Sequence, residues 1–138
     1  MTYLKAFVAG FVSTLVFHQG VLAILHAMGA FPRPAWSMAK TAPLGVPSVI
    51  SGAFWGGLWA IVLWLVIARL AGPAYWLTAM VFGAFVLSAV ALFVVMPLKG
   101  MPMAGGWNPK LIAGALILNG TWGLGVALLM RLMGRLRG

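Results

Sequence analysis

The chain has 138 residues, of which 64% are hydrophobic and only 7% are charged. A soluble domain has about a quarter charged residues, so this composition cannot build a water-facing surface. Every charge comes from nine Lys and Arg, because Asp and Glu are absent, and Cys is absent as well. The chain therefore cannot supply a disulfide, a thiolate, a carboxylate proton relay or a carboxylate acid/base pair. This composition favours a membrane protein that is not an enzyme, and it predicts no cofactor.

Four apolar segments are each long enough to cross a bilayer as an α-helix, which takes roughly 20 residues. They are residues 4–28, 48–68, 75–96 and 111–130. Pro and Gly punctuate the sequence between them, and the strict apolar/polar alternation of a barrel strand is absent. The sequence predicts one all-α transmembrane domain, a polytopic integral membrane protein built as a four-transmembrane-helix bundle.

Connections and charges between these segments predict an orientation. The expected connections are outer loops at 29–47 and 97–110, a short inner loop at 69–74 and a basic tail at 131–138. Positive residues favour the cytoplasmic side, and the densest group of them is in the tail, at Arg131, Arg135 and Arg137. We therefore expect cytoplasmic N- and C-termini in a cell membrane, the bacterial inner membrane being the favoured one.

The charges and the small size of the bundle indicate which partners to expect. The C-terminal Arg cluster is expected to bind anionic lipid headgroups, with the bilayer itself as the main partner. The basic residues flank apolar runs and do not form a stripe on a polar face, so nucleic acid is not expected. A small bundle without a soluble domain also favours a homo-oligomer or partner membrane subunits.

Small residues are expected to hold the helices together. Lipid gives helices no hydrophobic reason to associate, so close backbone approach at small side chains must contribute. The residues expected at such contacts are Gly52, Gly56, Ala60, Gly83 and Gly125. Packing within one chain is favoured over a dimer face, because four helices must first pack against each other.

Four polar residues fall at a similar depth in three of the predicted helices. They are His18, Gln19, Ser88 and Asn119, each about 12 to 15 Å from the outer helix end at 1.5 Å per residue. We expect that they meet as a polar cluster at the midplane. Hydrogen bonds that only join helices are the favoured interpretation, and a site lining a cavity is the alternative, since polar groups in a membrane are often functional.

Metal and haem binding have weak support. His26, Met101 and Met103 fall near the outer surface, and thioether sulfur with imidazole suits monovalent copper. His18 and His26 are eight residues apart on one helix, which allows haem ligation only with a ligand from another chain. Neither pattern is specific enough to predict a bound metal.

Three functions therefore remain open. The favoured one is a non-catalytic subunit or scaffold of a membrane assembly, because the sequence carries so little chemistry. An oligomeric channel or transporter for a small neutral or anionic solute is the alternative, since a positive protein disfavours cations. A haem- or copper-binding membrane protein is the third.

Overall fold

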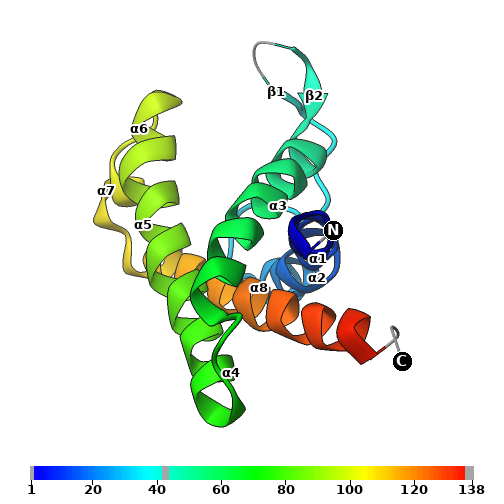
Figure 1. The fold of residues 1–138 in the computed structure, drawn as a ribbon. Helices are drawn as coiled ribbons and strands as arrows, with labels where there is room; N and C mark the ends of the chain where they lie inside the picture. The colour runs from blue at the N-terminus through cyan, green and yellow to red at the C-terminus, as the bar shows by residue number, and fades with distance from the viewer. Residues whose placement is uncertain (1, 42–43, 136–138) are drawn as a thin grey trace.

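A computed structural model describes residues 2–41 and 44–135 of the chain (Figure 1). Helices make up most of this part of the chain, and four of them are long and apolar enough to cross a membrane. Long helix 1 consists of α1 (Thr2–Ser13), η1 (Thr14–His18) and α2 (Gln19–Ala27), and long helix 2 is α3 (Ser48–Ile67). Long helix 3 consists of α4 (Gly72–Val81), η2 (Phe82–Leu87), α5 (Ser88–Val90), η3 (Ala91–Val95) and α6 (Met96–Leu98), and long helix 4 is α8 (Pro109–Arg135).

The segments η1, η2 and η3 are π-helical turns inside the long helices. Two of them lie beside residues that disturb the α-helical ladder. In η1 the Thr14 hydroxyl donates to the Gly10 carbonyl at 2.8 Å, a bond that tends to bend helices. Segment η3 ends just before Pro97, which lacks an N–H and crowds the carbonyl four residues earlier.

Long helices 1, 3 and 4 extend beyond the predicted segments, most clearly at the start of long helix 3 and at the end of long helix 4. The chain is helical from Gly72, with Pro73 in the first turn, where its missing N–H costs nothing. At the C-terminal end α8 runs to Arg135, so most of the segment predicted as a basic tail continues the helix. Arg and Leu are good helix formers, and the fall in hydropathy at residue 131 marks a change of surroundings without a break in the helix.

The two longer connections carry small structured elements. In the connection before α3, β1 (Lys40–Thr41) pairs antiparallel with β2 (Val46–Pro47), and the hydroxyl of Thr41 donates to the Val46 carbonyl at 2.8 Å. In the connection before α8 lies α7 (Ala104–Trp107), where Gly105 and Gly106 adopt positive φ.

Long helix 4 occupies the centre of the arrangement. It contacts both long helix 1 and long helix 3 along much of their lengths, whereas α3 packs chiefly against α1. Figure 1 shows α8 crossing between these groups. We call the end with Thr2 and Gly134 the terminal end, because both residues line one recess there, and the opposite end the loop end.

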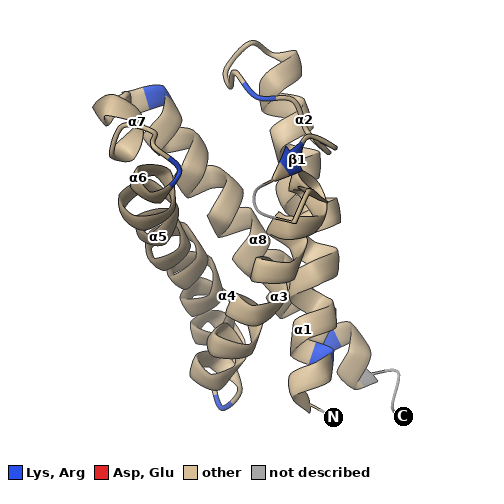
Figure 2. Ribbon diagram, turned by 90° about the horizontal axis from the view of Figure 1, so that it is seen from above, with Lys and Arg blue, Asp and Glu red and all other residues tan. Residues whose placement is uncertain are grey.

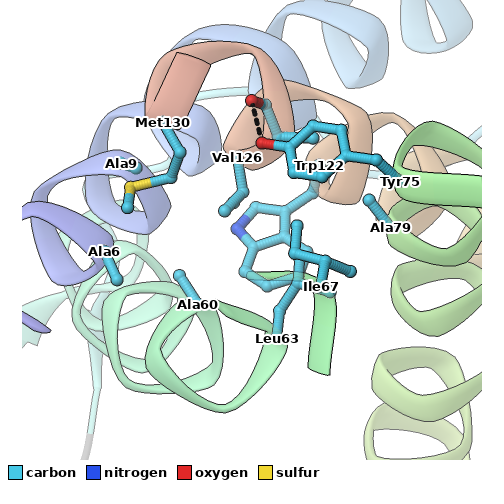
Figure 3. Close-up of a cluster of buried hydrophobic side chains, with 11 residues drawn as sticks. Ala6, Ala9, Ala60, Leu63, Ile67, Tyr75, Ala79, Trp122, Val126 and Met130 are labelled. Carbon is cyan, nitrogen blue, oxygen red and sulfur yellow. Dashed lines mark hydrogen bonds between the residues drawn. The ribbon is translucent and has the colours of Figure 1, made fainter. Parts of the chain in front are cut away.

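The main core lies toward the terminal end, where all four long helices contribute to it (Figure 3). Trp122 of α8 is buried at its centre, between alanines of α1 and α3 and the Tyr75 ring of α4. The indole Nε1 of Trp122 donates to the Gly10 carbonyl at 3.3 Å, and the Tyr75 hydroxyl donates to the Ala127 carbonyl at 2.6 Å. These bonds satisfy the two large polar rings inside an apolar cluster.

The core at the loop end is much smaller. Its buried residues are Leu22, Phe31 and Leu118, which come from long helix 1, the following connection and α8. Long helices 2 and 3 contribute none of them, and the contacts between these two helices are concentrated at α4 and η2. Both views show α5 and α6 diverging from α3 toward the loop end (Figures 1 and 2).

Positive charges gather toward the two ends of the long helices (Figure 2). Lys5, Arg69 and Arg131 belong to the terminal end, and Arg33, Lys99 and Lys110 to the loop end. The apolar middle between them is the arrangement expected for helices that cross a bilayer, with charges held near the headgroups. The fold therefore fits a membrane protein.

Candidate functional site

Asn119 and Ser88 form a buried polar pair between α8 and α5. The side-chain nitrogen of Asn119 donates to the Ser88 hydroxyl at 3.0 Å, and the two residues are 8% and 2% exposed. One turn away, the Gly83 Cα approaches the Asn119 backbone so closely that a Cβ atom there would collide with its carbonyl oxygen. The pair thus lies beside a close backbone contact between long helices 3 and 4, which continues to Gly123 and Ala79.

His18 and Gln19 form a second pair on long helix 1. Their side chains approach at 3.0 Å, between Gln19 Nε2 and His18 Nδ1. The Gln19 side-chain oxygen also accepts the backbone N–H of Trp36 at 2.8 Å, so Gln19 holds the following connection against the helix. Of the four residues predicted to meet, the structure joins His18 to Gln19 and Ser88 to Asn119. No hydrogen bond links one pair to the other within residues 2–41 and 44–135.

Trp36 folds back along long helix 1 and was not expected in any site. Its indole nitrogen donates to the Leu15 carbonyl at 2.8 Å, inside the π-helical segment η1, and its φ of 51° places it in the left-handed region. Nearby, the Arg33 guanidinium lies 5.6 Å from the centre of the Phe31 ring. Partial burial lowers the pKa of Arg33, but an Arg side chain stays charged at neutral pH.

Most of the predicted small-residue contacts lie at helix crossings. A Cβ on Gly56 would meet the Thr14 hydroxyl, and one on Gly125 would meet the side chains of Ser13 and Phe17. Ala60 is fully buried in the core. Gly52 differs, because a Cβ there would meet nothing within 4 Å.

The residues considered for a metal lie near the loop end. The His26 Nδ1 atom is 2.9 Å from the Phe31 carbonyl oxygen, so Nδ1 donates to that oxygen and only Nε2 of this ring could bind a metal. Met101 and Met103 are exposed. The described residues contain no group of three His, Cys, Asp or Glu side chains that could hold a metal ion.

A recess at the terminal end combines cations with aromatic rings. Lys5, Trp64, Tyr75 and Arg131 line it, and the Arg131 guanidinium lies 4.1 Å from the centre of the Tyr75 ring. From the sequence, Arg131 was expected only as a member of the C-terminal Arg cluster. Arg137 of that cluster falls outside the described residues, and the contact of Arg131 with Tyr75, 56 positions earlier, leaves no local sequence pattern.

We expect the hydrogen-bond pairs to be visible in double-mutant cycles on unfolding free energy in detergent. Ser88→Ala and Asn119→Leu should couple by about 0.5 to 1.5 kcal/mol, because they share a buried hydrogen bond. His18→Leu and Asn119→Leu should add to within about 0.5 kcal/mol. A larger coupling for His18 with Asn119 than for Ser88 with Asn119 would show that the division into two pairs is wrong.

Comparison with known proteins finds no matching family model, no matching curated protein and no matching solved structure.

Proposed function

We propose that this chain is a non-catalytic subunit of a membrane assembly, and that it binds a transmembrane helix of another subunit between α3 and long helix 3. In this proposal the four long helices form one transmembrane bundle in the bacterial inner membrane. The terminal end faces the cytoplasm and the loop end faces outward, as the Arg residues at the end of α8 favour.

The observation that carries the proposal is a change along one face of α3. Gly56 points into the protein, where a Cβ would meet the Thr14 hydroxyl and would lie 3.2 Å from both Trp122 Nε1 and the Gly10 oxygen. Gly52 lies on the same face, one turn (~6 Å) nearer the loop end, yet a Cβ there would meet nothing within 4 Å. α3 is therefore covered at Gly56 and open at Gly52, although Val49 and Ala53 beside it are buried.

The two hydrophobic clusters support the same proposal. All four long helices build the core at the terminal end, whereas α3 and long helix 3 contribute no buried residue to the one at the loop end. In lipid, helices associate through close packing at small residues. An exposed glycine at the edge of a buried helix face is a position where another helix can approach closely, and we infer that a partner helix takes this place.

The polar groups of the protein support a structural role over a catalytic one. Every fully buried side-chain N or O atom among the described residues has a hydrogen-bond partner within the chain. Such bonds stabilise helix contacts and leave no described buried group unpaired for chemistry. The formal net charge of +9 also favours a partner with acidic residues near the membrane surfaces, through electrostatic complementarity.

Site-specific crosslinking tests the proposal, because the chain has no Cys and each introduced thiol is unique. Gly52→Cys and Gly20→Cys are matched variants: both lie on a long helix with open space for a Cβ. Since α3 packs antiparallel to α1 with Gly56 beside Thr14, Gly52 lies about level with His18, close to the depth of Gly20.

A photoreactive thiol reagent on Gly52→Cys should give one discrete protein adduct in intact membranes, and the Gly20→Cys variant should give none. The mass of the adduct tells whether the partner helix belongs to a second copy or to a different polypeptide. Equal adducts at the two positions, or lipid adducts alone at Gly52→Cys, would contradict the proposal. Solute flux in liposomes containing only this chain would favour the channel instead.

A further inference from the structure

The terminal end carries a recess of about 410 Å³ to which all four long helices contribute. Its lining comes from long helix 1, the end of α3, the turn that follows, α4 and the last turns of α8. The residues among them that carry charge or an aromatic ring are Lys5, Trp64, Tyr75 and Arg131. A recess shared by four elements is a product of the tertiary fold, unlike a basic stretch of sequence.

Two cations face this recess without any side-chain carboxylate to balance them. Lys5 is half-buried on α1 and Arg131 lies on α8, and the whole chain contains no Asp or Glu. An ion pair with a side chain of the same molecule is therefore impossible for either residue. An anion that pairs with either cation must therefore come from outside the side chains of this protein.

Arg131 is held in place by its aromatic neighbour. Its guanidinium lies 4.1 Å from the centre of the Tyr75 ring, a favourable cation–π distance. The ring is itself fixed, since the Tyr75 hydroxyl donates to the Ala127 carbonyl at 2.6 Å and the residue is buried in the core. The cation–π contact orders the guanidinium and leaves N–H groups able to donate in the plane of the guanidinium, the geometry that suits phosphate.

A second recess, of about 290 Å³, shares Arg131 and is otherwise lined by Trp76, Leu128 and Leu132. Arg131 therefore lines two recesses. The larger one is also lined by Lys5, and the smaller one is otherwise lined by apolar and aromatic side chains. A phospholipid has this combination of chemistry, with an anionic phosphate joined to acyl chains. Trp and Tyr at the same level are typical of the membrane interface.

We propose that the recess between Lys5 and Arg131 is a binding site for a phosphate anion, in the form of an anionic phospholipid headgroup or of free phosphate. The site does not depend on a partner helix at the loop end. Both cations contribute charge, and Arg131 also donates N–H groups from a fixed position. This site differs from a general attraction of the basic C-terminal residues to anionic lipid, because it requires two particular residues that are 126 positions apart in the sequence.

The test is binding to purified protein in neutral detergent, measured by native mass spectrometry. Phosphatidylglycerol and phosphatidylcholine are titrated separately, and inorganic phosphate is added in a third arm as a competitor. The variants are Lys5→Gln, Arg131→Gln and the matched control Arg69→Gln. Arg69 is a cation of the same end, but it does not line the recess although its neighbours Ala68 and Leu70 do.

Only a few phosphatidylglycerol molecules should bind to each protein, and they should bind more tightly than phosphatidylcholine. Lys5→Gln and Arg131→Gln should each weaken this binding about fivefold, the equivalent of ~1 kcal/mol per basic residue, and Arg69→Gln should change it less than twofold. Competition by millimolar phosphate with the same dependence on both residues would identify free phosphate as a ligand.

Equal losses in all three variants would overturn the site, because they would show attraction to surface charge alone. Equal binding of the two lipids, with no effect of phosphate, would overturn it as well. The Lys5→Gln variant keeps the test decisive if Arg131→Gln fails to fold, because Lys5 makes no side-chain hydrogen bond among the residues described. Size-exclusion elution and melting temperature in detergent verify the fold of each variant.

Discussion

Gly83→Leu should separate long helix 3 from α8 and lower the free energy of unfolding by about 3 kcal/mol. A Cβ at Gly83 would collide with the Asn119 carbonyl oxygen, and it would lie 3.1 Å from the Asn119 carbonyl carbon and 3.2 Å from the Gly123 Cα. All three are backbone atoms of one helix and cannot rotate away. Long helix 3 makes most of its contacts through α8, so the whole helix must shift.

Thermal unfolding in detergent measures this effect, with an expected fall in melting temperature of roughly 10 °C. Gly83→Ala should already be destabilising, since the Cβ alone produces the collision. Gly52→Leu is the matched control and should change the melting temperature of the isolated chain little, because its Cβ meets open space. Similar melting temperatures for Gly83→Leu and Gly52→Leu would contradict the packing described here.

The sequence predicted the four long apolar helices well, and the physical reason is clear. Runs of about 20 apolar residues between Pro- and Gly-rich breaks have few structures available in lipid except helices. The structure has four long apolar helices over the same regions. Helix ends were less predictable. The apolar segment ends at residue 130, but α8 continues to Arg135, because a change from apolar to basic side chains does not require the backbone to leave the helix.

The site was predicted less completely, since depth along a helix says nothing about the direction of a side chain. Ser88 and Asn119 lie at the same depth and point toward each other. His18 and Gln19 instead interact with each other, and Gln19 also binds Trp36. The uncovered position of Gly52 could not be read from its four-residue spacing to Gly56. That spacing places both glycines on one face of α3, but the divergence of long helix 3 decides which of them is covered.

Gly52→Trp should dissociate the assembly that we propose and leave the isolated chain folded. A Trp side chain at this position would occupy the space where the partner helix approaches closely, and overpacking of a close contact costs about 2 to 3 kcal/mol. Affinity for the partner should therefore fall about 30- to 150-fold. Gly20→Trp is the matched control, because Gly20 also has open space around it but lies on long helix 1 and not on α3.

The native mass of the complex extracted in mild detergent tests the central claim most directly. For the unmodified protein and for Gly20→Trp, we predict a complex heavier than the 14.6 kDa chain by at least one further polypeptide. For Gly52→Trp, we predict the mass of the single chain, with or without bound lipid. A single-chain mass for the unmodified protein, or a complex that survives Gly52→Trp, would contradict the account.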